Sequence, residues 1–515
     1  MIGFIKKTFK ENWKKFIFFV ILNLGLFLYD GYIYEDVEHK KLLPLVLVFF
    51  TLLEFLLVVF YYKLKAKNWK IEKIFLALAI PLGVLHAFIT PVNQVPDEIV
   101  HIMRAEDVSE GKFVSPRNNG EYYRGVSSSA FKLFNNAQSD RGYYKTVKNQ
   151  ILEPTSPDLW YYGYDSTTLY RPIAYAPQAT GLAVGRFFRL PAGMTIYIGR
   201  ICSVLLFALI VFFAIKLTPK FKEFFVIFGL LPLALQQAGS FSVDSMVIAS
   251  CFLMIALAMK YAYGDDKKLG IKELGLITFA SYFSAATKSL LYLPLGLLLV
   301  LIPAKKFKKP ILKYVFLAFL VALSLGAYKL WLNMQEPAPA VVATTSTETL
   351  TETVVTEQPS KNPFKFLVIA FGNIFGISTE SLLNSTVGTS LSYYTMVAPA
   401  GIYIYIFIAL LVVMIIRSSE RIAFRKLDKL IIWVTPIIMV LAMYYVAYYE
   451  WKYIEAGRLI SGVNGRYIVP FLPLIPFMFC SKKEKKTEQL SLDYVFLFTV
   501  FSNIIILSMK VLHNF

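Results

Sequence analysis

An acid, a base and a cation recur at helical spacing in residues 91–105. At 100° per residue, Asp97, His101 and Arg104 fall on one face of a helix that Pro96 can start, and apolar residues fall on the opposite face. A carboxylate there can take the proton of an attacking hydroxyl group, and a nearby cation can offset charge growing on a phosphate leaving group, as glycosyl transfer needs. The alternative is that Asp97 and Glu98 only complement the helix dipole and that His101 pairs locally.

A second polar motif spans residues 170–178 and contains Arg171, Tyr175 and Gln178. The Arg171 guanidinium can clamp a phosphate through two parallel hydrogen bonds. Tyr175 and Gln178 are further candidates for substrate binding. The other interpretation is an arginine that is only solvated or ion-paired.

Three more charged residues stand at the edges of apolar runs. Asp244 follows a serine-rich turn, where it can bind substrate or only cap the next helix. Lys288 interrupts a long apolar stretch, where a lysine is costly without a partner unless it snorkels to the interface. Arg466 and Tyr467 follow two glycines, which either let the backbone approach a ligand closely or only make a tight turn.

Metal and nucleotide sites have little support in the sequence. The four histidines are too scattered for a histidine zinc site, and no glycine-rich phosphate loop is present. The Asp97-Glu98 pair is a candidate for holding a divalent cation such as Mg²⁺ or Mn²⁺, although a lone acidic pair is weak evidence for one. No cofactor is therefore assigned, and the metal requirement stays open.

The composition excludes a cytosolic globular enzyme. Of the 515 residues, 57% are apolar and 17% are charged, and the mean hydropathy is +0.56. An ordinary soluble domain has about 45–50% apolar and about 25% charged residues. Three cysteines in apolar runs also exclude a disulfide framework. The sequence predicts an all-α, polytopic membrane protein.

Apolar runs bounded by charge give 13 candidate membrane spans, some of them short, since a helix needs about 20 residues to cross. Seven basic clusters hold 30 of the 53 Lys and Arg residues and lie on alternate loops, which predicts a cytoplasmic N-terminus and an external C-terminus. The net charge of +19 thus reflects topology, and no nucleic-acid partner is expected. The candidate spans are 16–34, 42–62, 74–90, 195–217, 224–238, 243–263, 274–287, 289–303, 311–331, 397–416, 430–449, 467–480 and 494–511.

Two external segments are long. The first, 91–194, is nearly neutral and rich in Tyr, Asn, Ser and Pro, as saccharide-binding surfaces and many other loops are; within it, 171–191 is expected to form a helix lying against the membrane face. The second, 335–363, is Thr-rich and is expected to be a flexible insertion. The chain is divided into an N-terminal two-span hairpin with a basic cytoplasmic loop, a membrane core and a C-terminal span, at 1–73, 74–480 and 481–515.

In order along the chain, these motifs resemble a bacterial polytopic membrane-protein family of unassigned function in the GT-C glycosyltransferase superfamily, similar to protein O-mannosyltransferases. The resemblance covers about residues 74–480 and implies a GT-C-like fold of about 13 transmembrane helices with a large first external loop. It rests on Pro96-Asp97-Glu98, His101, Arg104-Ala105, Glu110-Gly111, Arg171-Pro172-Ile173, Tyr175-Ala176-Pro177-Gln178, Ser242, Asp244, Lys288, Tyr292, Pro294, Gly462-Val463-Asn464-Gly465-Arg466-Tyr467 and Pro470.

The superfamily transfers a sugar from a polyprenyl-phosphate or polyprenyl-diphosphate carrier to an acceptor on the outer face. The resemblance implies that Asp97 is the acidic catalytic residue, with Glu98 beside it, and that Arg171, Lys288 and Arg466 are candidates for holding the carrier phosphate. The expected partners are a polyprenyl-phosphate-linked sugar, an extracellular glycan or lipid-linked acceptor, and the lipid of a bacterial plasma membrane.

Three rival functions stay open. They are a flippase or transporter of lipid-linked glycans, a polysaccharide polymerase, and a non-catalytic glycan-binding scaffold. A long external loop that begins with an acid is not something a flippase requires.

Overall fold

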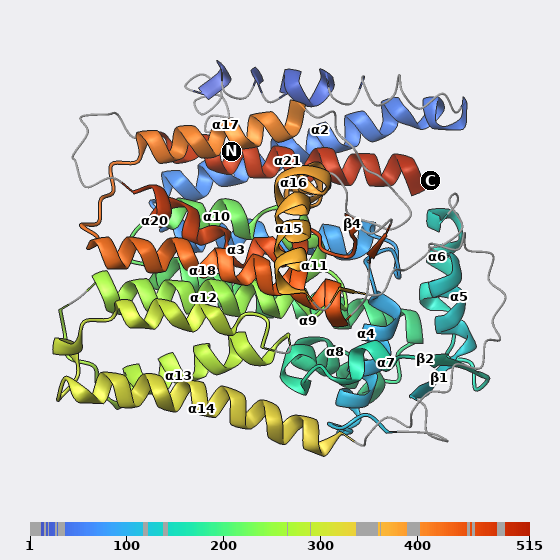
Figure 1. Cartoon of the computed structure of the whole chain (residues 1–515). Coiled ribbons are helices and arrows are strands. Elements are labelled where there is room, and N and C mark those ends of the chain that lie inside the picture. Colours follow the sequence, from blue (N-terminus) through green and yellow to red (C-terminus); the bar gives the residue numbers. More distant parts are fainter. Residues whose placement is uncertain are drawn as a thin grey trace.

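The computed structural model describes residues 37–514 apart from 117–121, 137–142, 265, 289, 336–358, 361, 389–401, 451–453, 456–458 and 481–489, and describes only parts of 12–28. The described chain is mostly helical. Long helices run side by side, and a unit of short helices with one pair of strands lies at one end of them (Figure 1).

Seven helices in the described residues are long and apolar enough to cross a membrane, or eight if one bent pair counts as a single span. The expectation of 13 spans is therefore too high, while the polytopic architecture holds. The seven are α2 (Val37–Ala66), α3 (Ile71–Ile89), α9 (Ala192–Leu217), α12 (Asp244–Tyr263), α14 (Ile311–Met334), α18 (Lys426–Tyr445, continued by the π-helical η5, Val446–Glu450) and α21 (Leu492–Asn514).

The other apolar runs form shorter pieces, largely because proline interrupts them. Residues 224–238 divide at Pro232, and 467–480 contain three prolines, so neither run makes a continuous long helix. The run 16–34 falls partly outside the described residues. The shorter elements are α10 (Lys222–Gly229), α11 (Pro232–Ala238), α13 (Ile271–Ala286), η2 (Leu293–Leu301), η3 (Ala304–Lys306), α15 (Pro363–Gly372), η4 (Asn373–Ile377), α16 (Thr379–Val387), α17 (Ile402–Arg417), β3 (Ile454–Glu455), β4 (Leu459–Ile460), α19 (Gly465–Ile468), η6 (Val469–Leu474) and α20 (Ile475–Phe479).

Helices α12 and α21 are the most buried of the seven. In the most apolar stretch of each, 94% of the residues are buried, compared with 17% in α14 and 28% in α2. The exposed side chains of α2 and α14 are large and apolar, which suits a surface that faces lipid. Helix α9 packs against α3 and α12, and α2 packs against α21.

The unit of short elements, here called the loop unit, comprises residues 91–191. It has its own apolar core, built around Leu133, Phe134 and Tyr164. Its strands pair antiparallel from Tyr123 opposite Gly163 to Ser127 opposite Leu159. Its elements are α4 (Glu98–Ser109), β1 (Tyr123–Ser127), α5 (Ser128–Asn136), α6 (Tyr143–Leu152), β2 (Leu159–Gly163), α7 (Asp165–Thr168), η1 (Pro172–Tyr175) and α8 (Ala176–Phe187).

Helix α8 joins the loop unit to the long helices. With 12 residues it is too short to span a membrane, and it packs along α9 and α4. Gly181 and Gly199 make this close approach possible, because a Cβ on Gly181 would lie 2.5 Å from the Gly199 Cα. The position of α4 is therefore tied to the first long helix that follows the loop unit.

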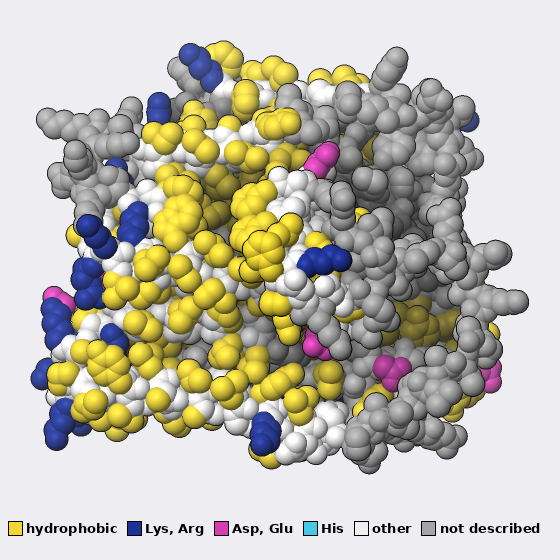
Figure 2. Space-filling model, in the orientation of Figure 1, with side chains coloured by type: hydrophobic (Ala, Val, Ile, Leu, Met, Phe, Trp, Pro, Cys, Tyr) yellow, Lys and Arg dark blue, Asp and Glu magenta, His cyan; other side chains and the backbone are white. Residues whose placement is uncertain are grey.

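The visible side of the long helices is mainly apolar (Figure 2). Lys and Arg side chains gather along the edge of this side that is farthest from the loop unit (Figures 1 and 2). The expected Thr-rich insertion at 335–363 falls almost entirely outside the described residues.

Candidate functional site

Helix α4 begins at an acid whose backbone is in an uncommon conformation. Asp97 precedes the first helical residue with φ 66° and ψ 12°, in the left-handed region. Asp tolerates this region better than most residues, and such backbone conformations concentrate at functional sites. The turn places the Asp97 carboxylate where α4 meets the segment around Arg466.

Four side chains that are distant in sequence form a line of alternating charge. Arg466 Nη2 donates to Asp97 Oδ2 at 3.0 Å, and Arg466 Nε lies 3.5 Å from Asp244 Oδ2. Lys288 Nζ donates to Asp244 Oδ1 at 2.5 Å. We call this line, Asp97–Arg466–Asp244–Lys288, the charge chain. Two carboxylates balance two cations, so the chain carries no net charge.

The charge chain is buried at one end and open at the other. The side chains of Asp244, Lys288 and Arg466 are 0%, 6% and 7% exposed, whereas that of Asp97 is 45% exposed. A buried carboxylate is tolerated only when it is paired and hydrogen-bonded, and the Ser242 hydroxyl beside Asp244 adds a further polar contact. Asp97 is therefore the member of the chain that an external ligand can reach.

Tyr467 and Gly465 hold the cations of the charge chain in place. Lys288 Nζ lies 4.1 Å from the centroid of the Tyr467 ring, a cation–π contact, and the Tyr292 hydroxyl donates to the Tyr467 carbonyl at 3.1 Å. Gly465 packs on α16, and a Cβ there would lie 2.1 Å from the Thr386 amide nitrogen. The glycine before Arg466 thus allows close approach of backbone to backbone.

Neighbouring charges and burial set the protonation states of Asp97, His101 and Tyr175 at the exposed end of the charge chain. Burial raises the pKa of Asp97, but neighbouring basic groups, Arg466 first among them, outweigh it and hold that pKa below its ordinary value. Burial lowers the pKa of His101 to about 4, so the ring is neutral near pH 7. His101 Nδ1 lies 2.7 Å from the Tyr175 hydroxyl, and burial keeps the pKa of Tyr175 well above its ordinary value. Asp97 is therefore ionised beside a neutral histidine.

Glu98 points away from Asp97 into a separate buried ion pair. Both of its carboxylate oxygens accept from Arg200 Nη2 at 2.7 Å, and they also accept from the amides of Asn93 and Phe241. Arg200 further donates to three carbonyls at the end of α3. The sequence analysis did not single out Arg200, although a charged residue inside an apolar helix is a recognisable signal.

Arg104 and Gln178, which the sequence predicted to bind substrate, instead donate hydrogen bonds to backbone carbonyls. Arg104 is fully buried and donates to the carbonyls of Lys112, Phe113 and Tyr170. Gln178 Nε2 donates to the carbonyls on either side of Phe241, at residues 240 and 242. Both residues therefore fix loops on which the site depends.

Arg171 is a buried cation with unusual surroundings. It is 6% exposed, and its terminal nitrogens Nη1 and Nη2 have no hydrogen-bond partner among the described residues. Its guanidinium carbon lies 5.5 Å and 5.8 Å from the ring centroids of Tyr282 and Tyr328. Arg171 therefore keeps hydrogen-bonding capacity for an anion, held over two aromatic rings.

The described residues contain no group of three or more His, Cys, Asp or Glu side chains placed to hold a metal ion. Asp97 and Glu98, adjacent in sequence, each pair with a different arginine. The arrangement of these two carboxylates therefore does not fit a shared divalent cation.

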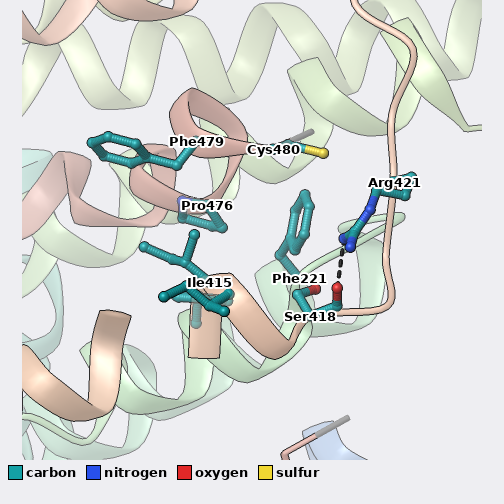
Figure 3. Close-up of a pocket in the computed structure, with 9 residues that line it drawn as sticks. Phe221, Ile415, Ser418, Arg421, Pro476, Phe479 and Cys480 are labelled. Atoms are coloured by element: carbon teal, nitrogen blue, oxygen red, sulfur yellow. Dashed lines mark hydrogen bonds between the residues drawn. The ribbon is translucent and has the colours of Figure 1, made fainter. Parts of the chain in front are cut away.

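One pocket of about 200 Å³ lies away from the charge chain, lined mainly by Phe221, Ile415, Pro476 and Phe479 (Figure 3). Its Arg421 guanidinium donates to the Ser418 carbonyl at 2.5 Å. None of the residues predicted for chemistry lines this pocket.

Comparison with known proteins identifies a family but no reaction. No curated protein and no solved structure matches the chain. A family model described as a predicted membrane protein (DUF2142) matches residues 80–475, which include the whole loop unit and the charge chain. The chain therefore belongs to the DUF2142 family of predicted membrane proteins.

Proposed function

We propose that the protein is a membrane glycosyltransferase related to the GT-C superfamily. It transfers a sugar from a polyprenyl-phosphate-linked donor to a hydroxyl group of a cell-envelope glycan on the external face. The acceptor oxygen bonds to the anomeric carbon as the bond from that carbon to the phosphate oxygen breaks. The hydroxyl proton passes to Asp97, and the polyprenyl phosphate leaves with the bonding electron pair, which gives inversion.

The observation that carries this proposal is the asymmetry of the charge chain. Asp97 is ionised and 45% exposed, while Arg466, Asp244 and Lys288 behind it are buried and paired. A general base must reach the proton that it removes, and its orientation must be held by surrounding groups. Arg466 supplies that orientation through its bond to Asp97.

The leaving group needs a cation that is not already neutralised. Lys288 and Arg466 are both paired with carboxylates in the charge chain. Arg171 is the better candidate to bind the donor phosphate, because its terminal nitrogens lack hydrogen-bond partners in the described part of the chain. A guanidinium can bind two phosphate oxygens at once.

The proposal places the loop unit outside the cell. The basic residues at the opposite edge of the long helices support this orientation, since Lys and Arg concentrate on the cytoplasmic side (Figures 1 and 2). Arg104 and Gln178 serve as positioning residues, because each is engaged by loop backbone, whereas Glu98 stabilises the fold through its ion pair with Arg200.

Transfer of labelled sugar from a polyprenyl-linked donor pool, in membranes that contain the protein, tests the proposal. We expect Asp97→Asn to lower transfer by at least about 100-fold, the low end for loss of a general base. Asp165→Asn is the matched control, because Asp165 is an exposed acid in the same loop unit. Equal transfer by wild type and Asp97→Asn, or none by wild type with verified donors, would favour the scaffold or flippase.

A further inference from the structure

A pocket lies between the loop unit and the start of α9, where Glu106 of α4 faces residues 192–196. Its volume is about 310 Å³, within the usual range of about 300–1,000 Å³ for small-molecule sites. Met103 and Glu106 of α4 contribute to its lining, together with Arg124, Arg186 and Phe134 from neighbouring elements. The pocket therefore combines polar groups of both signs with apolar walls.

Helix periodicity explains why α4 serves two sites. At 100° per residue, Glu106 lies about 140° around the helix from His101. Glu106 and Glu110, which follows the helix, line the pocket, whereas His101 and Asp97, which precedes the helix, belong to the charge-chain end. One rigid helix of 12 residues thus fixes the spacing between the pocket and the proposed base.

The charged groups of the pocket neutralise one another. Arg124 Nη1 pairs with Asp107 Oδ1 at 2.6 Å, and Arg124 also pairs with Glu110. Arg186 pairs with Glu106 and donates to the Ser109 hydroxyl at 2.6 Å. This differs from Arg171, whose terminal nitrogens have no described hydrogen-bond partner. A pocket of paired charges favours a neutral, hydroxyl-rich ligand over an anion, because an anion would compete with carboxylates that are already bound.

An exposed aromatic ring on strand β2 lies next to the pocket. Leu159 lines the pocket, and Tyr161, two residues further and therefore on the same face of the strand, is 67% exposed. A Cβ on the pocket residue Gly125 would lie 3.3 Å from Tyr161 Cε1, so this ring borders the pocket, whereas Trp160 points to the opposite face and stacks on Phe131. A flat ring at the edge of a pocket that holds carboxylates and guanidinium groups is suited to a sugar, since C–H faces stack on the ring while hydroxyl groups bond to the polar groups.

We propose that this pocket binds an uncharged saccharide and that its occupant is a sugar of the acceptor glycan. The acceptor role rests on the proposed function, whereas saccharide binding by the pocket can be measured without any transfer. The saccharide can come from a free polymer or from a lipid-linked glycan, because both present the same neutral rings.

Binding of the full-length protein in detergent to immobilised neutral tetrasaccharides of glucose, galactose, mannose and N-acetylglucosamine tests the inference. We expect at least one probe to bind, and we expect the double variant Glu110→Gln/Arg186→Gln to weaken that binding at least tenfold. Both side chains lie at partly exposed ion pairs, so the fold should tolerate the changes. Lys132→Gln/Glu153→Gln is the control, an exposed ion pair of the same unit that does not line the pocket.

The outcomes separate the two proposals. Unchanged binding by Glu110→Gln/Arg186→Gln, or no binding of any of the four tetrasaccharides by wild type, overturns the saccharide pocket. Normal binding by Asp97→Asn that has lost transfer supports both proposals. If binding depends on the pocket residues but wild type shows no transfer, the saccharide-pocket proposal stands and the glycosyltransferase proposal is overturned. The same tetrasaccharide carried on polyprenyl diphosphate in nanodiscs distinguishes the sources, since binding of only this form identifies a lipid-linked acceptor.

Discussion

Arg466 Nη2 lies 3.0 Å from Asp97 Oδ2, which joins two residues 369 positions apart in the sequence. The same guanidinium donates to the Pro96 carbonyl at 3.3 Å, so Arg466 contacts both the Asp97 side chain and the backbone turn that carries Asp97. Because Asp97 sits in the left-handed region, this double contact helps hold an unfavourable backbone conformation. The two ends of the family region therefore meet at the proposed base.

Replacing Arg466 by lysine should impair transfer through Asp97. Lysine keeps the charge but has a single nitrogen, so it cannot contact Asp97, Asp244 and the Pro96 carbonyl together. We expect transfer to fall at least about tenfold, the equivalent of about 1.4 kcal/mol. We also expect the acidic limb of the pH–rate profile to move upward, because the pKa of Asp97 returns toward its ordinary value. Arg425→Lys, at an ion pair away from the site, should leave the profile unchanged.

Removing the charge of Lys288 should destabilise the protein. Lys288→Met leaves the Asp244 carboxylate buried with Arg466 Nε at 3.5 Å, and breaking a buried pair typically costs about 3–5 kcal/mol. We expect the free energy of unfolding to fall by about 3 kcal/mol, measured by thermal unfolding in detergent. The double variant Lys288→Met/Asp244→Asn should be more stable than Lys288→Met alone. A double variant that is less stable would contradict the assignment of this contact as a compensating ion pair.

Glu98 and Arg200 should behave as a structural pair rather than as part of the reaction. Both side chains are fully buried and bond to each other through two oxygens. We expect Glu98→Gln and Arg200→Met each to lower stability by about 3–5 kcal/mol, with strong coupling in a double-mutant cycle. If the protein is folded, the Glu98→Gln variant should keep most of the proposed transfer activity. A stable but inactive Glu98→Gln variant would instead place Glu98 in the chemistry.

His101 should make the folded state sensitive to acid. Its pKa falls from about 6.5 in an unfolded chain to about 4 in the folded protein, so the unfolded state binds more protons between these values. Its contribution to stability is complete above pH 6.5 and is lost as the pH falls toward 4. At 1.36 kcal/mol for each pKa unit, the loss is about 3 kcal/mol. His101→Gln should reduce the pH dependence of the free energy of unfolding between about pH 4 and 6.5. An unchanged pH dependence would show that other groups cause the acid sensitivity.

The sequence determined the class of the protein and much of its layout. Seven of the predicted apolar runs correspond to the seven helices long enough to cross a membrane. The other runs are apolar too, but in the described residues they fold into pieces too short to cross, largely where proline interrupts them, so counting apolar runs overestimated the spans. Helix periodicity predicted one helical face for Asp97, His101 and Arg104, whereas in the structure α4 begins at Glu98, Asp97 precedes it in the left-handed region, and Arg104 binds backbone carbonyls.

The tertiary structure decided which charged residues meet. Asp97 was recognisable from its spacing to His101, Asp244 and Arg466 from their places at the edges of apolar runs, and Lys288 as a costly charge in an apolar stretch, but their partners lie up to 369 residues away. Local sequence fixes the direction of a side chain along its own helix, whereas the packing of separate helices fixes what it faces. That packing placed Glu98 against Arg200 and left the terminal nitrogens of Arg171 without a described hydrogen-bond partner. It also joined Asp97, Arg466, Asp244 and Lys288 into one line whose last three members are buried, and these three are paired because unpaired charges are costly in an apolar interior.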